Sequence, residues 1–218
     1  MTTTLTRTDV ERLLQEGRPS DDRRPRRLRR SIAGLAIAGV LAIVGTATMS
    51  NADYSEKYVT DQLARQRITF KAADALTDAE RAHSCVVANA GKQLTTGKQA
   101  ECYANDFIGT HVMAIGKGRT YAELGDDRTG LLAQIATAQA NSDPELPKLQ
   151  KDLADLTGQR ETLFKAEMLR GALLSSFGFS TLGQKAGEAA TVAYAAAGVL
   201  AALSLGGLVF ALRTPGRP

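Results

Sequence analysis

The chain has 218 residues, 44% of them hydrophobic, and a formal net charge of +4, so its length fits one or two domains. Its apolar residues are concentrated in two uncharged runs, 31–52 and 189–212, of 22 and 24 residues. At about 1.5 Å per residue, each run forms a helix long enough to cross a hydrocarbon core of about 30 Å. This distribution excludes an ordinary soluble enzyme.

The charge is distributed unevenly along the chain. Residues 1–30 carry nine arginines and five acidic residues, whereas residues 53–188 carry 16 basic and 18 acidic residues. A nucleic-acid-binding domain requires positive charge clustered on a folded face, and the long region between the runs is slightly acidic. We therefore expect no nucleic-acid partner.

Basic residues at both ends set the expected orientation, because Lys and Arg close to span ends stay cytoplasmic. Arg213 and Arg217 follow the second run, and six topogenic arginines precede the first: Arg23, Arg24, Arg26, Arg27, Arg29 and Arg30. We predict a multi-pass protein of the cell (plasma) membrane with both termini cytoplasmic. The expected segments are a cytoplasmic Arg-rich segment (1–30), transmembrane helix 1 (31–52), an extracytoplasmic helical domain (53–188), transmembrane helix 2 (189–212) and a cytoplasmic tail (213–218).

A cleavable signal peptide is the alternative interpretation of the first run, because small residues occupy Ser50 and Ala52. The run is longer than the roughly 7–15 apolar residues of a typical signal peptide, which favours a retained helix. Residues 53–188 are expected outside under either interpretation.

Capping-box patterns, in which Ser or Thr is followed three residues later by Glu or Gln, predict the helix starts. They begin at Thr8, Thr77, Thr96, Thr120 and Ser142. The first four helices are expected to end near Gly17, Gly91, Gly116 and Asn141. Residues 67–71 alternate like a strand but are too few to form a sheet alone. We therefore predict an all-α fold, with two transmembrane helices flanking an extracytoplasmic bundle of four helices.

The helix after Ser142 is expected to be the longest. Its leucines recur at a 3,4 spacing typical of a helical-hairpin seam, with Arg160 in one apolar position. They are Leu146, Leu149, Leu153, Leu156 and Leu163. The uncharged stretch 171–184 is too short to span a bilayer. It either lies at the outer membrane surface or continues the long helix into the second span.

Cys85 and Cys102 are the two cysteines of the chain. An even count in an oxidising compartment favours a disulfide, which would stabilise a loop of about 15 residues by about 3 kcal/mol. Two buried thiols, or a redox or metal role, are the alternatives. A Cys₂His₂ metal site with His83 and His111 is disfavoured, because structural zinc ligands usually come in closely spaced pairs. We predict no metal, no cofactor and no catalytic residues, since neither a nucleophile-elbow nor a phosphate-binding motif occurs.

Each apolar run carries a row of small residues at helical spacing. Such rows let helix backbones approach closely in lipid. The rows are Gly34, Ala38 and Ala42 in the first run, and Gly198, Ala202 and Gly206 in the second. They predict helix packing, either of the two runs on each other or of this hairpin on another membrane protein or a second copy.

Four stretches carry a family resemblance: Gln93–Ala100, Tyr103–Asn105, Gly118–Glu123 and Glu161–Gly171. With the order of span, helical domain and span, they resemble an uncharacterised group of actinobacterial two-span membrane proteins over residues 31–212. Members often carry the automatic name aromatic ring-opening dioxygenase. That chemistry uses a non-haem iron commonly held by two histidines and a carboxylate, an arrangement that the two histidines here do not show. The resemblance implies the two-span topology and no established activity.

The functional expectation follows from these features. We expect a non-catalytic integral membrane accessory or scaffold protein that presents a helical extracytoplasmic domain and contacts the lipid bilayer and another membrane protein or a second copy. An extracytoplasmic sensor that signals through a partner is the alternative. An envelope enzyme is a third interpretation, disfavoured because no catalytic constellation occurs.

Overall fold

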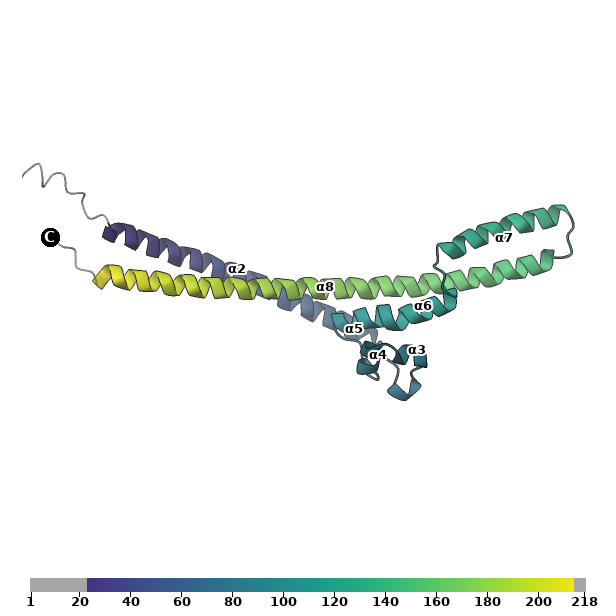
Figure 1. Cartoon of the computed structure of the whole chain (residues 1–218), viewed down its shortest axis with the longest axis horizontal. Helices are drawn as coiled ribbons and strands as arrows, with labels where there is room; N and C mark the ends of the chain where they lie inside the picture. The colour runs from purple at the N-terminus through teal and green to yellow at the C-terminus, as the bar shows by residue number, and fades with distance from the viewer. Residues whose placement is uncertain (1–22, 214–218) are drawn as a thin grey trace, which may run out of the picture. The chain divides into compact units, whose positions relative to one another are not determined.

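The computed structural model describes residues 23–213, which divide into two compact units: residues up to 49 together with those from 188 onward, and residues 50–187. The helices in chain order are α2 (Arg23–Gln66), α3 (Asp78–Arg81), α4 (Ser84–Asn89), α5 (Gly97–Cys102), α6 (Gly109–Gly116), α7 (Glu123–Ala140) and α8 (Leu146–Arg213) (Figure 1). A 3-10 turn, Ala73–Ala75, and a π-helical segment, Tyr103–Ile108, complete them. The all-α prediction is confirmed for these residues. The helix expected between Thr8 and Gly17 lies outside the described residues.

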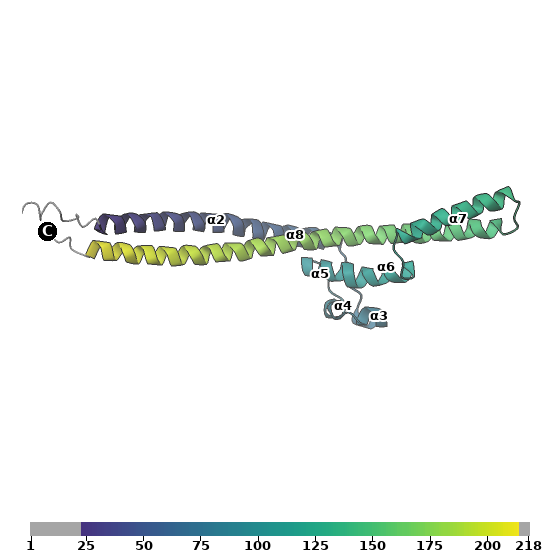
Figure 2. The ribbon, with the colours of Figure 1, turned by 45° about the horizontal axis from the view of Figure 1, so that its top comes forward.

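The first unit is an antiparallel pair formed by the beginning of α2 and the end of α8. Figures 1 and 2 show the two helices side by side over these residues. Tyr194 Oη donates to Thr46 Oγ1 at 3.0 Å, and a Cβ added at Gly207 would lie 2.8 Å from Ser31 Oγ. The residue number therefore rises along α2 as it falls along α8, which makes the pair a helical hairpin.

Helix α8 runs without interruption from Leu146 to Arg213. Of the two alternatives for residues 171–184, the structure has the continuous helix. Gly178 and Gly183 lie inside it without ending it, and Gly183 permits close packing, since a Cβ there would lie 3.0 Å from Ser55 Cβ. Ser55 Oγ also donates to the carbonyl oxygen of Phe179 at 2.9 Å. Helix α2 likewise continues past the first apolar run as far as Gln66.

Three of the predicted capping boxes form as the sequence indicates. The Thr77 and Thr96 side chains accept hydrogen bonds from the third backbone N–H of α3 and α5, respectively, and the reciprocal bonds are also present. At Thr120 the same pair of bonds joins its backbone N–H to Glu123 Oε2 at 2.7 Å and the Glu123 N–H to Thr120 Oγ1 at 3.3 Å. These bonds satisfy backbone donors that a helix start leaves unpaired.

Two helix predictions are wrong in detail. The helix after Thr77 is two short helices, because His83 has an extended backbone (φ −98°, ψ 105°) between α3 and α4. Ser142 does not open α8: it has a left-handed φ of 52°, and Asp143 Oδ1 instead accepts the Glu145 N–H at 2.8 Å. The Asp143 carboxylate therefore binds the backbone N–H group that the Ser142 hydroxyl was expected to bind.

The core of the second unit collects side chains from most of its elements. The largest fully buried apolar side chains are Leu63, Phe70, Val86, Leu94, Leu163 and Leu173. The strand-like stretch 67–71 contributes an isolated antiparallel bridge, Thr69 with Gln93, rather than a sheet. Leu163 is buried, and the other predicted seam leucines are half-buried where α7 lies beside the start of α8 (Figure 2). The Arg160 guanidinium lies 4.4 Å from the centroid of the Tyr121 ring, which accounts for a charged residue in that seam.

Candidate functional site

The two cysteines lie on neighbouring short helices of the second unit. Cys85 is in the first turn of α4, and Cys102 is the last residue of α5. Their sulfurs lie at disulfide-bond distance, with the Cα atoms 6.1 Å apart, which is the pairing that the sequence predicts. Cys102 is 5% exposed, whereas Cys85 is half-buried. Cys85 is therefore the more exposed of the two residues.

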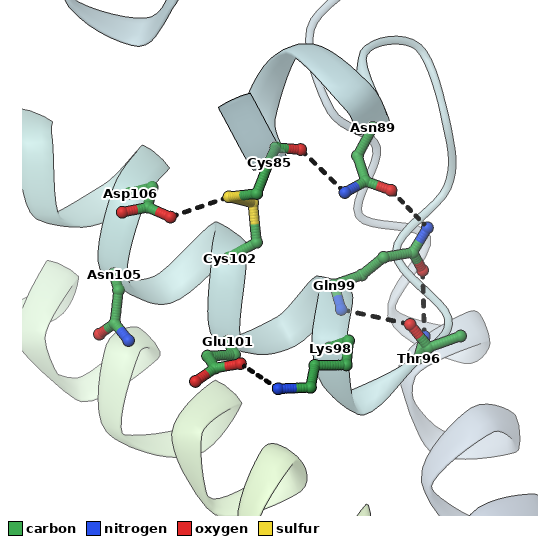
Figure 3. Close-up of a pocket in the computed structure, with 9 residues that line it drawn as sticks. All are labelled: Cys85, Asn89, Thr96, Lys98, Gln99, Glu101, Cys102, Asn105 and Asp106. Atoms are coloured by element: carbon green, nitrogen blue, oxygen red, sulfur yellow. Dashed lines mark hydrogen bonds and ion pairs between the residues drawn. A yellow bond between two sulfur atoms is a disulfide. The ribbon is translucent and has the colours of Figure 1, made fainter. Parts of the chain in front are cut away.

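A pocket of about 480 Å³ lies against this cysteine pair, between α4, α5 and the π-helical segment (Figure 3). Hydrogen bonds connect several of the residues that line it. Gln99 Nε2 donates to Asn89 Oδ1 at 3.2 Å, and Asn89 Nδ2 donates to the Cys85 carbonyl oxygen at 2.9 Å. Lys98 Nζ pairs with Glu101 at 3.1 Å on the opposite wall. Most of the residues that line the pocket are polar, and several of them have hydrogen-bond or ion-pair partners within it.

The Asp106 carboxylate lies in the same pocket, next to the cysteine pair. It lies one helical turn beyond Cys102, within the π-helical segment, and such segments are frequent at functional sites. Its Oδ2 atom lies 2.8 Å from Cys85 Sγ (Figure 3), and its Oδ1 atom lies 3.2 Å from His83 Nδ1. The other ring nitrogen of His83 lies 3.2 Å from Thr110 Oγ1. The Cys85 and Cys102 sulfurs and one Asp106 oxygen all lie within 4.8 Å of one another.

The two histidines occupy separate clusters, so the structure does not assemble the Cys₂His₂ set. His83 contacts Asp106, whereas His111 Nε2 lies 3.3 Å from Glu80 Oε1. Sequence reasoning missed Asp106 as a neighbour of the cysteines. The i,i+4 spacing of Cys102 and Asp106 was the available signal, because residues four apart share a helix face.

Glu80 forms a buried ionic cluster beside this site. Its side chain is 1% exposed, and Lys71 Nζ lies 2.7 Å from its Oε1 atom. The Thr77 backbone N–H donates to its Oε2 atom at 2.7 Å. Burial opposes the charged form, but the hydrogen bonds from Lys71 and Thr77 outweigh it and lower the pKa of Glu80 from 4.5 to about 2. Burial and the Glu80 charge together raise the pKa of Tyr103. Glu80 therefore anchors this unit as a carboxylate.

The two rows of small residues lie in different surroundings. Gly34 and Ala38 are buried against the α8 side of the hairpin, and Gly34 is in contact with Ser204. Ala42 is half-buried, whereas Gly198, Ala202 and Gly206 are exposed. A Cβ added at Gly198 or Gly206 would meet nothing within 4 Å. The α8 side of the hairpin instead uses Ala197, Ser204 and Gly207.

Both long helices are long and apolar enough to cross a membrane, within Pro25–Gln66 and Leu146–Arg213, and 17% of the most apolar window of each is buried. Arg26, Arg29 and Arg30 are exposed near the start of α2, and the Arg27 guanidinium lies 5.2 Å from the Phe210 ring centroid. The side chains of Arg23 and Arg24 lie outside the described residues.

No protein-family model, curated protein or solved structure matches the chain.

Proposed function

We propose that the chain is a two-span protein of the cell membrane that acts as a non-catalytic accessory protein. Its spans are residues 31–52 and 189–212, its termini are cytoplasmic, and its second unit is extracytoplasmic. In this proposal the accessory face consists of Gly198, Ala202 and Gly206, and it packs against a helix of another membrane protein or of a second copy.

The exposure of large apolar side chains supports the membrane assignment. On α2 they include Ile37, Val40 and Ile43, and on α8 Val199, Leu203 and Leu205, each more than half exposed. Contiguous apolar surface of this extent is rare on proteins that face water, and lipid is its natural solvent. The antiparallel pairing of the two helices, with arginines at the start of α2 and the end of α8, supports placing both ends on the cytoplasmic side.

The open face of α8 is the observation that carries the accessory role. Helix association in lipid relies on close packing at small residues, since lipid tails are as apolar as leucine. The hairpin already closes through Gly34, Ala38, Ser204 and Gly207. Gly198 and Gly206 meet nothing within 4 Å and lie on a different face. A further helix is the occupant that such a face suits in a bilayer.

Cysteine labelling in intact cells tests the topology. In the Ser142→Cys variant, we expect a membrane-impermeant maleimide to label the new thiol, because the exposed turn after α7 lies outside in this proposal. In the Ser20→Cys variant, labelling is expected only after the cells are lysed. Labelling of Ser20→Cys in intact cells contradicts the proposed orientation.

Substitution of the open glycines tests the accessory role. Gly198→Leu or Gly206→Leu should block close approach of a partner helix without preventing insertion, because leucine inserts readily. We expect a defined cross-linked species with the wild type, recovered in mild detergent, and its loss in at least one variant. The matched control is Ala196→Leu, an exposed alanine on another face of α8, which should retain the species. If the wild type purifies alone after cross-linking in cells, the accessory role is wrong.

A further inference from the structure

We propose that the Cys85–Cys102 pair is a redox-gated zinc site, in which reduction of the disulfide frees both sulfurs to bind Zn²⁺ together with the Asp106 carboxylate. The inference concerns the second unit alone and does not depend on membrane insertion. It assigns to Asp106 a role that a purely structural disulfide does not need.

The position of the Asp106 carboxylate is the first argument. Its Oδ2 atom lies 2.8 Å from Cys85 Sγ, and a disulfide sulfur carries no hydrogen that this oxygen could accept. In the reduced protein the Cys85 thiol donates a hydrogen bond to the same oxygen, and a bound cation replaces that proton. The carboxylate is therefore placed to serve the reduced state, either as a hydrogen-bond acceptor or as a metal ligand.

The ligand geometry is the second argument. Thiolate and carboxylate ligands in a tetrahedral zinc site lie about 3.6–3.8 Å from one another, given Zn–S near 2.3 Å and Zn–O near 2.1 Å. The three donor atoms here already lie within 4.8 Å of one another, and the cysteine Cα atoms are 6.1 Å apart. Once the S–S bond is broken, small side-chain rotations bring the sulfurs to the required separation without moving α4 or α5.

The surroundings supply the remaining parts of a zinc site. Cys102 and Asp106 lie one helical turn apart, and Cys85 comes from a second helix, so the ligands converge from two elements. His83 Nδ1 lies 3.2 Å from Asp106 Oδ1, as an outer partner that orients a ligating carboxylate. The three donor residues line the pocket of about 480 Å³, so a bound ion would have room for water or a small ligand as its fourth ligand, as in zinc sites with three protein ligands.

Reduction of the Cys85–Cys102 disulfide requires a dithiol as the electron donor. The donor transfers two electrons and two protons, becoming a disulfide itself, while the Cys85–Cys102 bond breaks and each sulfur becomes a thiol. Zn²⁺ then displaces the two thiol protons into solvent and binds both thiolates. The bound ion offsets two of the three negative charges that the thiolates and the Asp106 carboxylate bring together.

Cobalt titration of the full chain in mild detergent tests the site. The protein is reduced with a phosphine under anaerobic conditions, freed of reductant, checked for helicity by circular dichroism, and titrated with Co²⁺. We expect one equivalent to produce a sulfur-to-cobalt charge-transfer band that Zn²⁺ abolishes, and no band with the unreduced protein. His83→Ala should weaken binding by about 10–100-fold, and Asp106→Asn by at least as much.

The matched control is Glu101→Gln, which removes another carboxylate of the same pocket, one that pairs with Lys98. Its cobalt affinity should equal that of the wild type. The proposal is overturned if the reduced, helical wild type shows no band, or if Asp106→Asn binds cobalt as tightly as the wild type. Loss of helicity on reduction also overturns it, because the three donors would then no longer be held together.

Discussion

Replacing Glu80 with glutamine is expected to lower the free energy of unfolding of the second unit by about 3 kcal/mol at neutral pH. The pKa of Glu80 is lowered from 4.5 to about 2, and each pKa unit corresponds to about 1.4 kcal/mol. A glutamine amide has only one oxygen, so its NH₂ group would face either the Lys71 ammonium or the Thr77 N–H, both of which are donors. A buried donor without an acceptor adds to the loss.

The same substitution should change how stability depends on pH. Because the pKa of Glu80 is lower in the folded protein, its contribution is complete above about pH 4.5 and is lost as the pH falls toward 2. Urea denaturation followed by circular dichroism at pH 7, 4.5 and 3 measures this. We expect the wild-type midpoint to fall across the acidic range and the Glu80→Gln midpoint to fall less.

A solvent-exposed carboxylate provides the control for this prediction. Glu161 pairs with Lys165 on α8, and its side chain is 64% exposed. Glu161→Gln should leave the midpoint at pH 7 within about 0.5 kcal/mol of the wild type, as is usual for surface substitutions. Equal losses in the two variants, or parallel pH profiles for Glu80→Gln and the wild type, would show that the buried cluster does not hold the unit together.

Gly97→Ala is expected to destabilise the second unit by about 1–3 kcal/mol, the usual cost of overpacking a filled site. Gly97 opens α5 where this helix crosses α8, and an added Cβ would overlap the Ser180 Cβ atom and lie 2.6 Å from Ser180 Oγ. The added Cβ would also be in van der Waals contact with the Phe177 Cα atom, 3.5 Å away. The urea midpoint at pH 7 measures the change.

Gly171→Ala is the matched control, because it makes the same substitution inside α8 where a Cβ meets nothing within 4 Å. It should stabilise the protein by about 0.5–1 kcal/mol, since glycine is unfavourable within a helix. Adding Ser180→Gly to Gly97→Ala removes the overlapping side chain and should recover part of the loss, less the cost of a helical glycine. A neutral Gly97→Ala variant would mean that α5 and α8 do not need this close approach.

Local patterns in the sequence were sufficient to predict the starts of α3, α5 and α7 and the all-α class. A capping box involves residues three apart, so Thr77, Thr96 and Thr120 determine their own hydrogen bonds with little help from the rest of the fold. Ser142 is the exception, because Asp143 offers the same donors a competing carboxylate. The division of the helix after Thr77 was not predictable, since the extended backbone at His83 accompanies contacts with Thr110 and Asp106, which are distant in sequence.

Helical periodicity showed which residues share a face, but only the tertiary structure decided what each face meets. The two rows of small residues look alike in the sequence, yet Gly34 lies against Ser204 while Gly198 faces open space. The cysteine pairing followed from the count of two, whereas the approach of Asp106 to Cys85 did not, because these residues belong to different helices. Spacing along one helix is set by its covalent geometry, and the distance between two helices is set by the side chains that pack between them.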